Sequence, residues 1–318
     1  MAGPLGELFD HGCDALNTTF ECLLCISALN LGRSYWTVAS LVATLSTFYL
    51  TTWEEYHTGT LFLSAFSGPV EGILMICAIY FITAIAGGPS FWDQGIFNVT
   101  GLENFELVRK SALLRSWNIP LNETFMTFGA FGLLANIVAS YSNVAAARRK
   151  RSQAVWQPAA GLFPLVAAIT ANIVWLSAQN ARILADGKTF VPFCLFWGLT
   201  FAYNVGLVIV AHVTKAPFPY WNMALIWSIL GALDASLPSP LVQSSIAKTQ
   251  LVVYASLIFS FLLYAHFCHN VVTTITSELG TACFSVRPPT INKKLGEQIR
   301  QLESAEISAK AKGKAKAQ

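Results

Sequence analysis

The sequence predicts an all-α protein, a polytopic membrane helical bundle of about eight transmembrane helices. Hydrophobic residues make up 54% of the chain and charged residues only 12%, about half of the ~25% charged residues usual in soluble domains. Apolar segments close to the ~20 residues needed to cross a bilayer recur along the chain. This composition excludes a soluble globular domain as the main body of the protein.

Each predicted helix is a mostly apolar segment bounded by polar residues, glycine or proline. The seventh is cut short, because Asp234 and the pair Pro238 and Pro240 end it early. The predicted spans are 8–30, 35–52, 67–87, 123–145, 157–178, 189–212, 219–236 and 249–270. No short repeat divides them, so we expect one membrane domain over residues 1–287.

Residues 288–318 differ in composition from the rest of the chain. They begin near Pro288-Pro289 and end in alternating alanine, lysine and glycine. Low-complexity basic segments lack the apolar residues needed to form a packed core. We expect a disordered cytosolic tail with a short helix around 292–304. Its role is solubilising, or alternatively it is attracted to anionic lipid.

Basic residues predict the orientation of the helices. The densest basic cluster, Arg148–Arg151, should face the cytosol by the positive-inside rule. Counting helices from it places loops 53–66 and 213–218 and the start of the chain on the cytosolic side. The long loop 88–122 then lies on the lumenal side, where its two glycosylation sequons, at Asn98 and Asn122, would be accessible.

Two carboxylates at the start of the first span are the most informative polar residues. Gly6, Asp10 and Asp14 have the spacing G-x-x-x-D-x-x-x-D, which places both aspartates on one face of a helix. Carboxylates entering a membrane segment are costly and mark functional sites. The pair can share Mg²⁺ or Mn²⁺, or one can bind the metal while the other accepts a proton. Gly6 leaves room beside the helix.

The motif and three later segments resemble the CDP-alcohol phosphotransferase family, in its cholinephosphotransferase and ethanolaminephosphotransferase branch. The family signature reads D-x-x-D-G-x-x-A-R, eight residues, and then G-x-x-x-D-x-x-x-D. The matching segments are Gly3–Asp14 (GPLGELFDHGCD), Thr52–Gly59 (TWEEYHTG), Gly68–Gly72 (GPVEG) and Thr83–Gly87 (TAIAG). The resemblance is strong through about residue 95 and spans most of the chain.

The resemblance implies a phosphoryl transfer. The hydroxyl of diacylglycerol attacks the β-phosphorus of CDP-choline or CDP-ethanolamine, which releases CMP and forms a phospholipid. By position, Asp10 and Asp14 correspond to metal ligands for Mg²⁺ or Mn²⁺, Asp14 also to the catalytic base, and Gly6 to a substrate-binding glycine beside the nucleotide. The resemblance also implies an endoplasmic reticulum or Golgi membrane, with the active site facing the cytosol. It suggests a homodimer, and no nucleic-acid partner is expected.

Other polar residues near the same membrane surface are further candidates. Glu54, Glu55 and His57 fall in the predicted cytosolic loop, where they could bind the head group of the substrate or assist proton transfer. The alternative, given equal weight, is a solvated loop with interfacial aromatic residues. His212, near a helix end, is expected to contact terminal carbonyls or lipid head groups.

The first half of the family signature has no counterpart, because only five residues precede Gly6. The single Asp-Gly pair, Asp186-Gly187, continues as Lys-Thr-Phe and lies in a predicted lumenal loop. We therefore expect Met1 to be an internal methionine of a longer chain, and this chain alone to be inactive or nearly so. One alternative is a non-catalytic membrane protein of the same fold that acts as a dimer partner. A transporter is less favoured, because no inverted repeat is evident.

Overall fold

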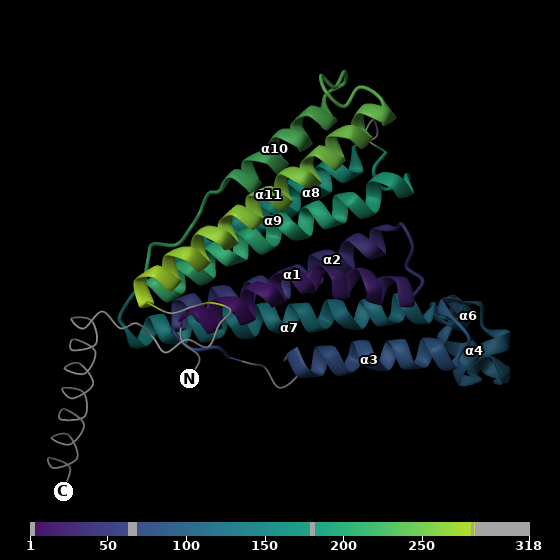
Figure 1. Ribbon diagram of the computed structural model, residues 1–318. Helices are drawn as coiled ribbons and strands as arrows, with labels where there is room; N and C mark the ends of the chain where they lie inside the picture. Colours follow the sequence, from purple (N-terminus) through teal and green to yellow (C-terminus); the bar gives the residue numbers. More distant parts are fainter. Residues whose placement is uncertain (1–3, 63–68, 179–181, 281–282, 284–318) are drawn as a thin grey trace, which may run out of the picture. The chain divides into compact units, whose positions relative to one another are not determined.

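The computed structural model describes residues 4–62, 69–178, 182–280 and 283. These residues form helices joined by loops (Figure 1), and the β-pairing among them is one isolated bridge between Gly95 and Pro120. The all-α prediction is confirmed. The predicted boundary near residue 288 and the short helix around 292–304 lie outside the described residues.

Each of the eight predicted spans coincides with a helix. These helices are α1 (Pro4–Ala28), α2 (Tyr35–Thr58), α3 (Pro69–Ile85), α7 (Leu121–Lys150), α8 (Phe163–Ser177) preceded by η3 (Gln157–Leu162), α9 (Gly187–Thr214), α10 (Met223–Ser236) and α11 (Ile246–Leu279). The predicted loop 88–122 contains short helices of its own. These are η1 (Pro89–Asp93), α4 (Ile96–Thr100), η2 (Leu102–Asn104), α5 (Glu106–Lys110) and α6 (Ala112–Ser116).

The long apolar helices identify an integral membrane protein. Among the described residues, four helices are long and apolar enough to cross a membrane. They are Leu121–Lys150, Gln157–Ser177, Gly187–Thr214 and Ile246–Leu279. Two shorter helices, Gly72–Ile85 and Met223–Ser236, are also apolar. The number of spans therefore stays a prediction.

Residues 7–264 form one compact unit, whereas Gly6 and the part of α11 after residue 264 belong to another. Within the compact unit, α2 packs against both α7 and α9, and α8 packs against α10 (Figure 1). In the most apolar stretch of α9, 72% of the residues are buried, compared with 17% in the corresponding stretch of α7. Helix α9 is therefore an interior helix, whereas few residues of α7 are buried.

Two aromatic side chains fasten α2 to η3. The Tyr49 hydroxyl donates a 2.7 Å hydrogen bond to the carbonyl of Gly161, and Nε1 of Trp53 donates a 2.9 Å bond to the carbonyl of Pro158. Both side chains are fully buried. Buried tyrosine and tryptophan need such partners for their polar atoms, so these two bonds fix the position of the C-terminal half of α2.

The predicted end of the second span at residue 52 is wrong. Helix α2 continues to Thr58, and Gly59 caps it with a left-handed φ of 78° and a hydrogen bond from its N–H to the carbonyl of Glu55. The alternative of a solvated loop would place Trp53 at the membrane interface, but this residue is buried in the core. Since this packing extends the helix, Glu54, Glu55 and His57 lie on its last turns and not in a loop.

Candidate functional site

The ends of several helices meet on one side of the compact unit. The guanidinium of Arg151, directly after α7, donates hydrogen bonds of 3.0 and 3.1 Å to the carbonyls of His57 and Thr58 at the end of α2. The Tyr56 hydroxyl donates a 2.8 Å bond to the carbonyl of Ala216, just after α9. The sequence predicted these three helix ends on the same side of a membrane, and the contacts agree with that grouping.

The two aspartates of the motif are exposed on α1. Asp10 and Asp14 lie one turn apart, so both project from the same face of the helix, as expected. Two carboxylates open to solvent are a donor set that suits Mg²⁺ or Mn²⁺. Gly6 is the third residue of the same helix. The assignment of these three residues to metal, catalysis and substrate stays a prediction.

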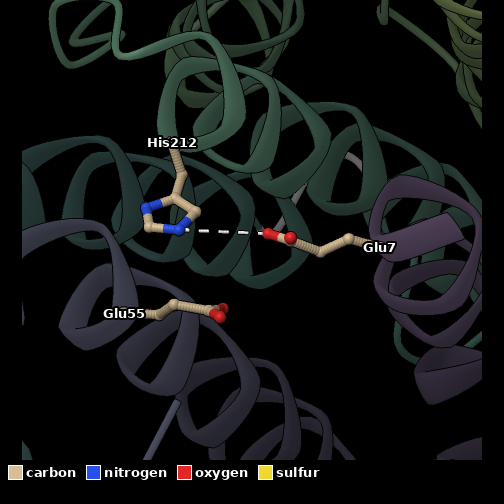
Figure 2. Close-up of side chains that lie close together, drawn as sticks. All are labelled: Glu7, Glu55 and His212. Atoms are coloured by element: carbon tan, nitrogen blue, oxygen red, sulfur yellow. Dashed lines mark ion pairs between the residues drawn. The ribbon is translucent and has the colours of Figure 1, made fainter. Parts of the chain in front are cut away.

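The convergence of three side chains, one of them the candidate Glu55, was not predicted, and His212 was expected to contact terminal carbonyls or lipid head groups instead. Figure 2 shows Glu7 from α1, Glu55 from α2 and His212 from α9 with their polar ends turned toward one another. One oxygen or nitrogen atom from each residue lies within 4.8 Å of the other two. Nε2 of His212 is 3.9 Å from Oε1 of Glu7, and this oxygen is buried without a hydrogen-bond partner. We refer to these residues as the Glu7–Glu55–His212 cluster.

Glu55 has the electrostatics of a group that can exchange protons. Burial raises the pKa of its carboxyl above the ordinary value, and the nearby Glu7 carboxylate adds to this rise. His11 and His212 act in the opposite direction, and Nδ1 of His11 lies 3.6 Å from Oε2 of Glu55. A raised pKa brings a carboxyl closer to the range in which general acids and bases work at neutral pH.

Glu54 is engaged in the packing of two helices. Its side chain is only 3% exposed and accepts a 2.7 Å hydrogen bond from Nδ2 of Asn143 on α7. Consecutive residues of a helix point about 100° apart, so Glu54 turns to α7 while Glu55 turns to the cluster. The alternative of a solvated loop is wrong for Glu54. The prediction that Glu54 binds substrate receives no support from this position.

His57 lies in an aromatic pocket. Its ring is stacked on Phe218 with 6.0 Å between ring centroids, and Trp53 and Tyr56 meet it edge-on. Burial lowers its pKa to about 4, and the positive charges of Arg148 and Arg151 add to this effect. The imidazole is therefore neutral at pH 7, so it does not attract a phosphate by charge.

The sequence did contain a signal for part of the cluster. Glu7, Asp10, His11 and Asp14 are spaced i, i+3, i+4 and i+7, which places all four on one face of a helix. The motif drew attention to the two aspartates only. His212 carries no local signal, because its partners come from other helices.

Comparisons with known proteins identify the family of this chain. No family model matches the chain. An uncharacterized CDP-alcohol phosphatidyltransferase class-I family protein of Schizosaccharomyces pombe is 36% identical over 297 residues, which cover 92% of this chain and 72% of that protein. Choline/ethanolaminephosphotransferase 2 of Arabidopsis thaliana is 32% identical over 302 residues, covering 90% and 71%. Choline/ethanolaminephosphotransferase 1 of Saccharomyces cerevisiae is 35% identical over 236 residues, covering 71% and 56%.

Proposed function

Because the chain belongs to the CDP-alcohol phosphatidyltransferase class-I family, we propose that it transfers phosphocholine or phosphoethanolamine from a CDP-aminoalcohol to diacylglycerol. The hydroxyl oxygen of diacylglycerol bonds to the β-phosphorus, the bond from that phosphorus to the bridging oxygen breaks, and CMP leaves. Two relatives named for an activity are choline/ethanolaminephosphotransferases. They do not favour the alternative of a non-catalytic dimer partner.

The observation that carries the proposal is the exposed pair Asp10 and Asp14 on one face of α1. We assign Asp10 and Asp14 as ligands of Mg²⁺ or Mn²⁺, which when bound neutralises charge on the pyrophosphate. Asp14 also accepts the proton of the attacking hydroxyl, and Gly6 leaves room for the nucleotide. Two carboxylates are fewer than a two-metal site normally uses, so this pair accounts for only part of such a ligand set.

The substrate-binding candidates differ in how well they fit this proposal. Glu55 fits because its carboxyl has a raised pKa and lies on the helix end that meets α1 through His11. Glu54 is left out because its carboxylate is bonded to Asn143. His57 is left out because its ring is neutral and packed among aromatic residues.

We also propose where the reaction takes place. The lipid acceptor arrives laterally through the membrane, and the nucleotide arrives from the cytosol at the side that carries Arg148–Arg151. This orientation follows from the positive-inside rule and from the bonds that Arg151 makes to the end of α2. We place the protein in the membrane of the endoplasmic reticulum or Golgi. We also propose that it forms a homodimer.

The test is a transfer assay on membranes from cells that express the gene carrying this sequence. CDP-choline and CDP-ethanolamine are supplied separately with diacylglycerol and Mg²⁺, and both CMP and phospholipid are measured. Asp14→Asn should lower turnover about 100- to 10,000-fold, the usual contribution of a general base, and EDTA should abolish it. The matched control is Glu106→Gln, which removes an exposed carboxylate from α5. Wild-type rates in both Asp10→Asn and Asp14→Asn, at equal protein levels, would refute the proposal.

A further inference from the structure

The Glu7–Glu55–His212 cluster joins three helices that are far apart in the sequence. Each residue lies on a different helix, α1, α2 or α9, and the three side chains converge (Figure 2). The helices are held close by other contacts. A Cβ atom added at Gly198 of α9 would lie only 2.7 Å from Cβ of Thr19 on α1. The convergence is therefore supported by packing outside the cluster.

The distances within the cluster do not correspond to direct hydrogen bonds. The 3.9 Å between Nε2 of His212 and Oε1 of Glu7 exceeds the 2.7–3.2 Å range of an N–H···O bond. Around a tetrahedral ion with bonds of about 2.1 Å, neighbouring ligand atoms lie ~3.4 Å apart. The three ligand atoms of the cluster lie within 4.8 Å of one another. Rotation of the flexible glutamate side chains toward a common ion would bring these atoms to that shorter spacing.

The charges of the cluster call for a cation. Two carboxylates face one another in a partly buried position, with side-chain exposures of 33% for Glu7 and 13% for Glu55. Oε1 of Glu7 is inaccessible and accepts no hydrogen bond, although buried polar atoms almost always have a partner. The imidazole of His11 lies beside Glu55, with Nδ1 3.6 Å from Oε2. A dication between the three side chains would balance both carboxylates and give this oxygen a partner.

We propose that Glu7, Glu55 and His212 bind a transition-metal dication of the Zn²⁺ type, which links α1, α2 and α9. An imidazole nitrogen with two carboxylate oxygens is a ligand set typical of Zn²⁺, whereas Mg²⁺ and Ca²⁺ prefer oxygen ligands throughout. Three protein ligands leave one position for water. His11, whose Nδ1 lies 3.6 Å from Oε2 of Glu55, is a positioning residue for this carboxylate, because carboxylates that bind a metal are themselves held by neighbouring polar groups. The site uses none of the atoms of Asp10 and Asp14.

The experiment measures binding of Zn²⁺ itself to the full chain. The protein is purified in detergent, stripped with EDTA and dialysed against buffered Zn²⁺ without nucleotide, and the metal bound per chain is determined by mass spectrometry. The wild-type chain should bind one Zn²⁺. The variants Glu55→Gln and His212→Gln should bind this ion about tenfold more weakly or worse. Glu106→Gln, the matched control, should bind Zn²⁺ as wild type does. Equal Zn²⁺ binding by wild type and both cluster variants would place the ion elsewhere and overturn the proposal.

Two further measurements separate this site from the proposed activity and from misfolding. Asp14→Asn should lose CMP release but keep its Zn²⁺, so failure of either proposal is visible without the other. Zn²⁺ should raise the melting temperature of the stripped wild-type chain, a comparison that needs no mutation. An unchanged melting temperature together with no bound Zn²⁺ would also overturn the proposal.

Discussion

Nδ2 of Asn143 on α7 donates a 2.7 Å hydrogen bond to Oε1 of Glu54 on α2. The Glu54 side chain is 3% exposed, so this bond lies between two packed helices close to the end of the bundle that carries the candidate site. The neighbouring Glu55 points instead to His11 and His212. Two consecutive glutamates thus have different surroundings, and only the second is open to the site.

Removing the amide partner of Glu54 should destabilise the protein. Asn143→Leu leaves a buried carboxylate without its donor, and the free energy of unfolding should fall by about 1–3 kcal/mol. Thermal unfolding in detergent measures the effect, with Asn104→Leu as a control at an exposed asparagine. Combining Asn143→Leu with Glu54→Met should restore part of the loss, because both polar partners are then gone. A single variant as stable as the control would contradict this account.

The close approach of α1 and α9 depends on the absence of a side chain at Gly198. An added Cβ would lie 2.7 Å from Cβ of buried Thr19, so Gly198→Ala should force the helices apart and cost about 1–3 kcal/mol. It should also weaken Zn²⁺ binding, because Glu7 and His212 lie on these helices. Gly132→Ala on α7 is the matched control, since nothing lies within 4 Å of an added Cβ there.

For that control, the stability of the protein should stay the same or rise, because alanine favours a helix interior over glycine. Melting temperatures and Zn²⁺ affinities of the two variants test the comparison. Equal behaviour of Gly198→Ala and Gly132→Ala would show that the contact between Thr19 and Gly198 does not set the helix spacing.

Only one of the two predicted glycosylation sequons suits a folded protein. Asn122 is buried, and its amide donates to the carbonyl of Leu29 at 3.2 Å and to Asp93 at 3.1 Å. Asn98 is exposed on α4. If the segment is lumenal, Asn98→Gln should abolish a shift in mobility on glycosidase treatment, and Asn122→Gln should leave that shift unchanged. The reverse pattern would contradict the structure around Asn122.

Asp186, the N-cap residue of α9, should make the stability of the protein depend on pH in the acidic range. Hydrogen bonds from Gln250 and from the N–H of Lys188 lower the pKa of Asp186 below its ordinary value of 3.8. A lowered pKa means that the stabilisation is complete above 3.8 and is lost as pH falls through the folded-state value. Melting temperatures between pH 3 and 6 should therefore fall more steeply for wild type than for Asp186→Asn. Parallel curves for the two proteins would show that the Asp186 carboxyl has the same pKa in the folded and unfolded states.

The helices could be predicted because their signal is local. A chain in lipid must satisfy its backbone hydrogen bonds within each segment, so long apolar stretches such as 123–145 and 189–212 had to be helical. The end of α2 was misplaced for a related reason. Trp53 and Tyr56 suit both a membrane interface and a buried position with a hydrogen-bond partner, and sequence does not distinguish the two. The bond to Pro158 lies in the buried interior for Trp53, whereas Tyr56 is half-buried and bonds to Ala216.

The sequence by itself determined the membrane-helical fold, the shared face of Asp10 and Asp14, and the family resemblance that relatives later supported. All three depend on residues within one helix or one motif. The tertiary structure alone decided that Glu54 is bonded to α7, that His57 is packed among aromatic rings, and that Glu7, Glu55 and His212 converge. These contacts depend on how separate helices rotate and pack against one another, which the periodicity of a single helix leaves open.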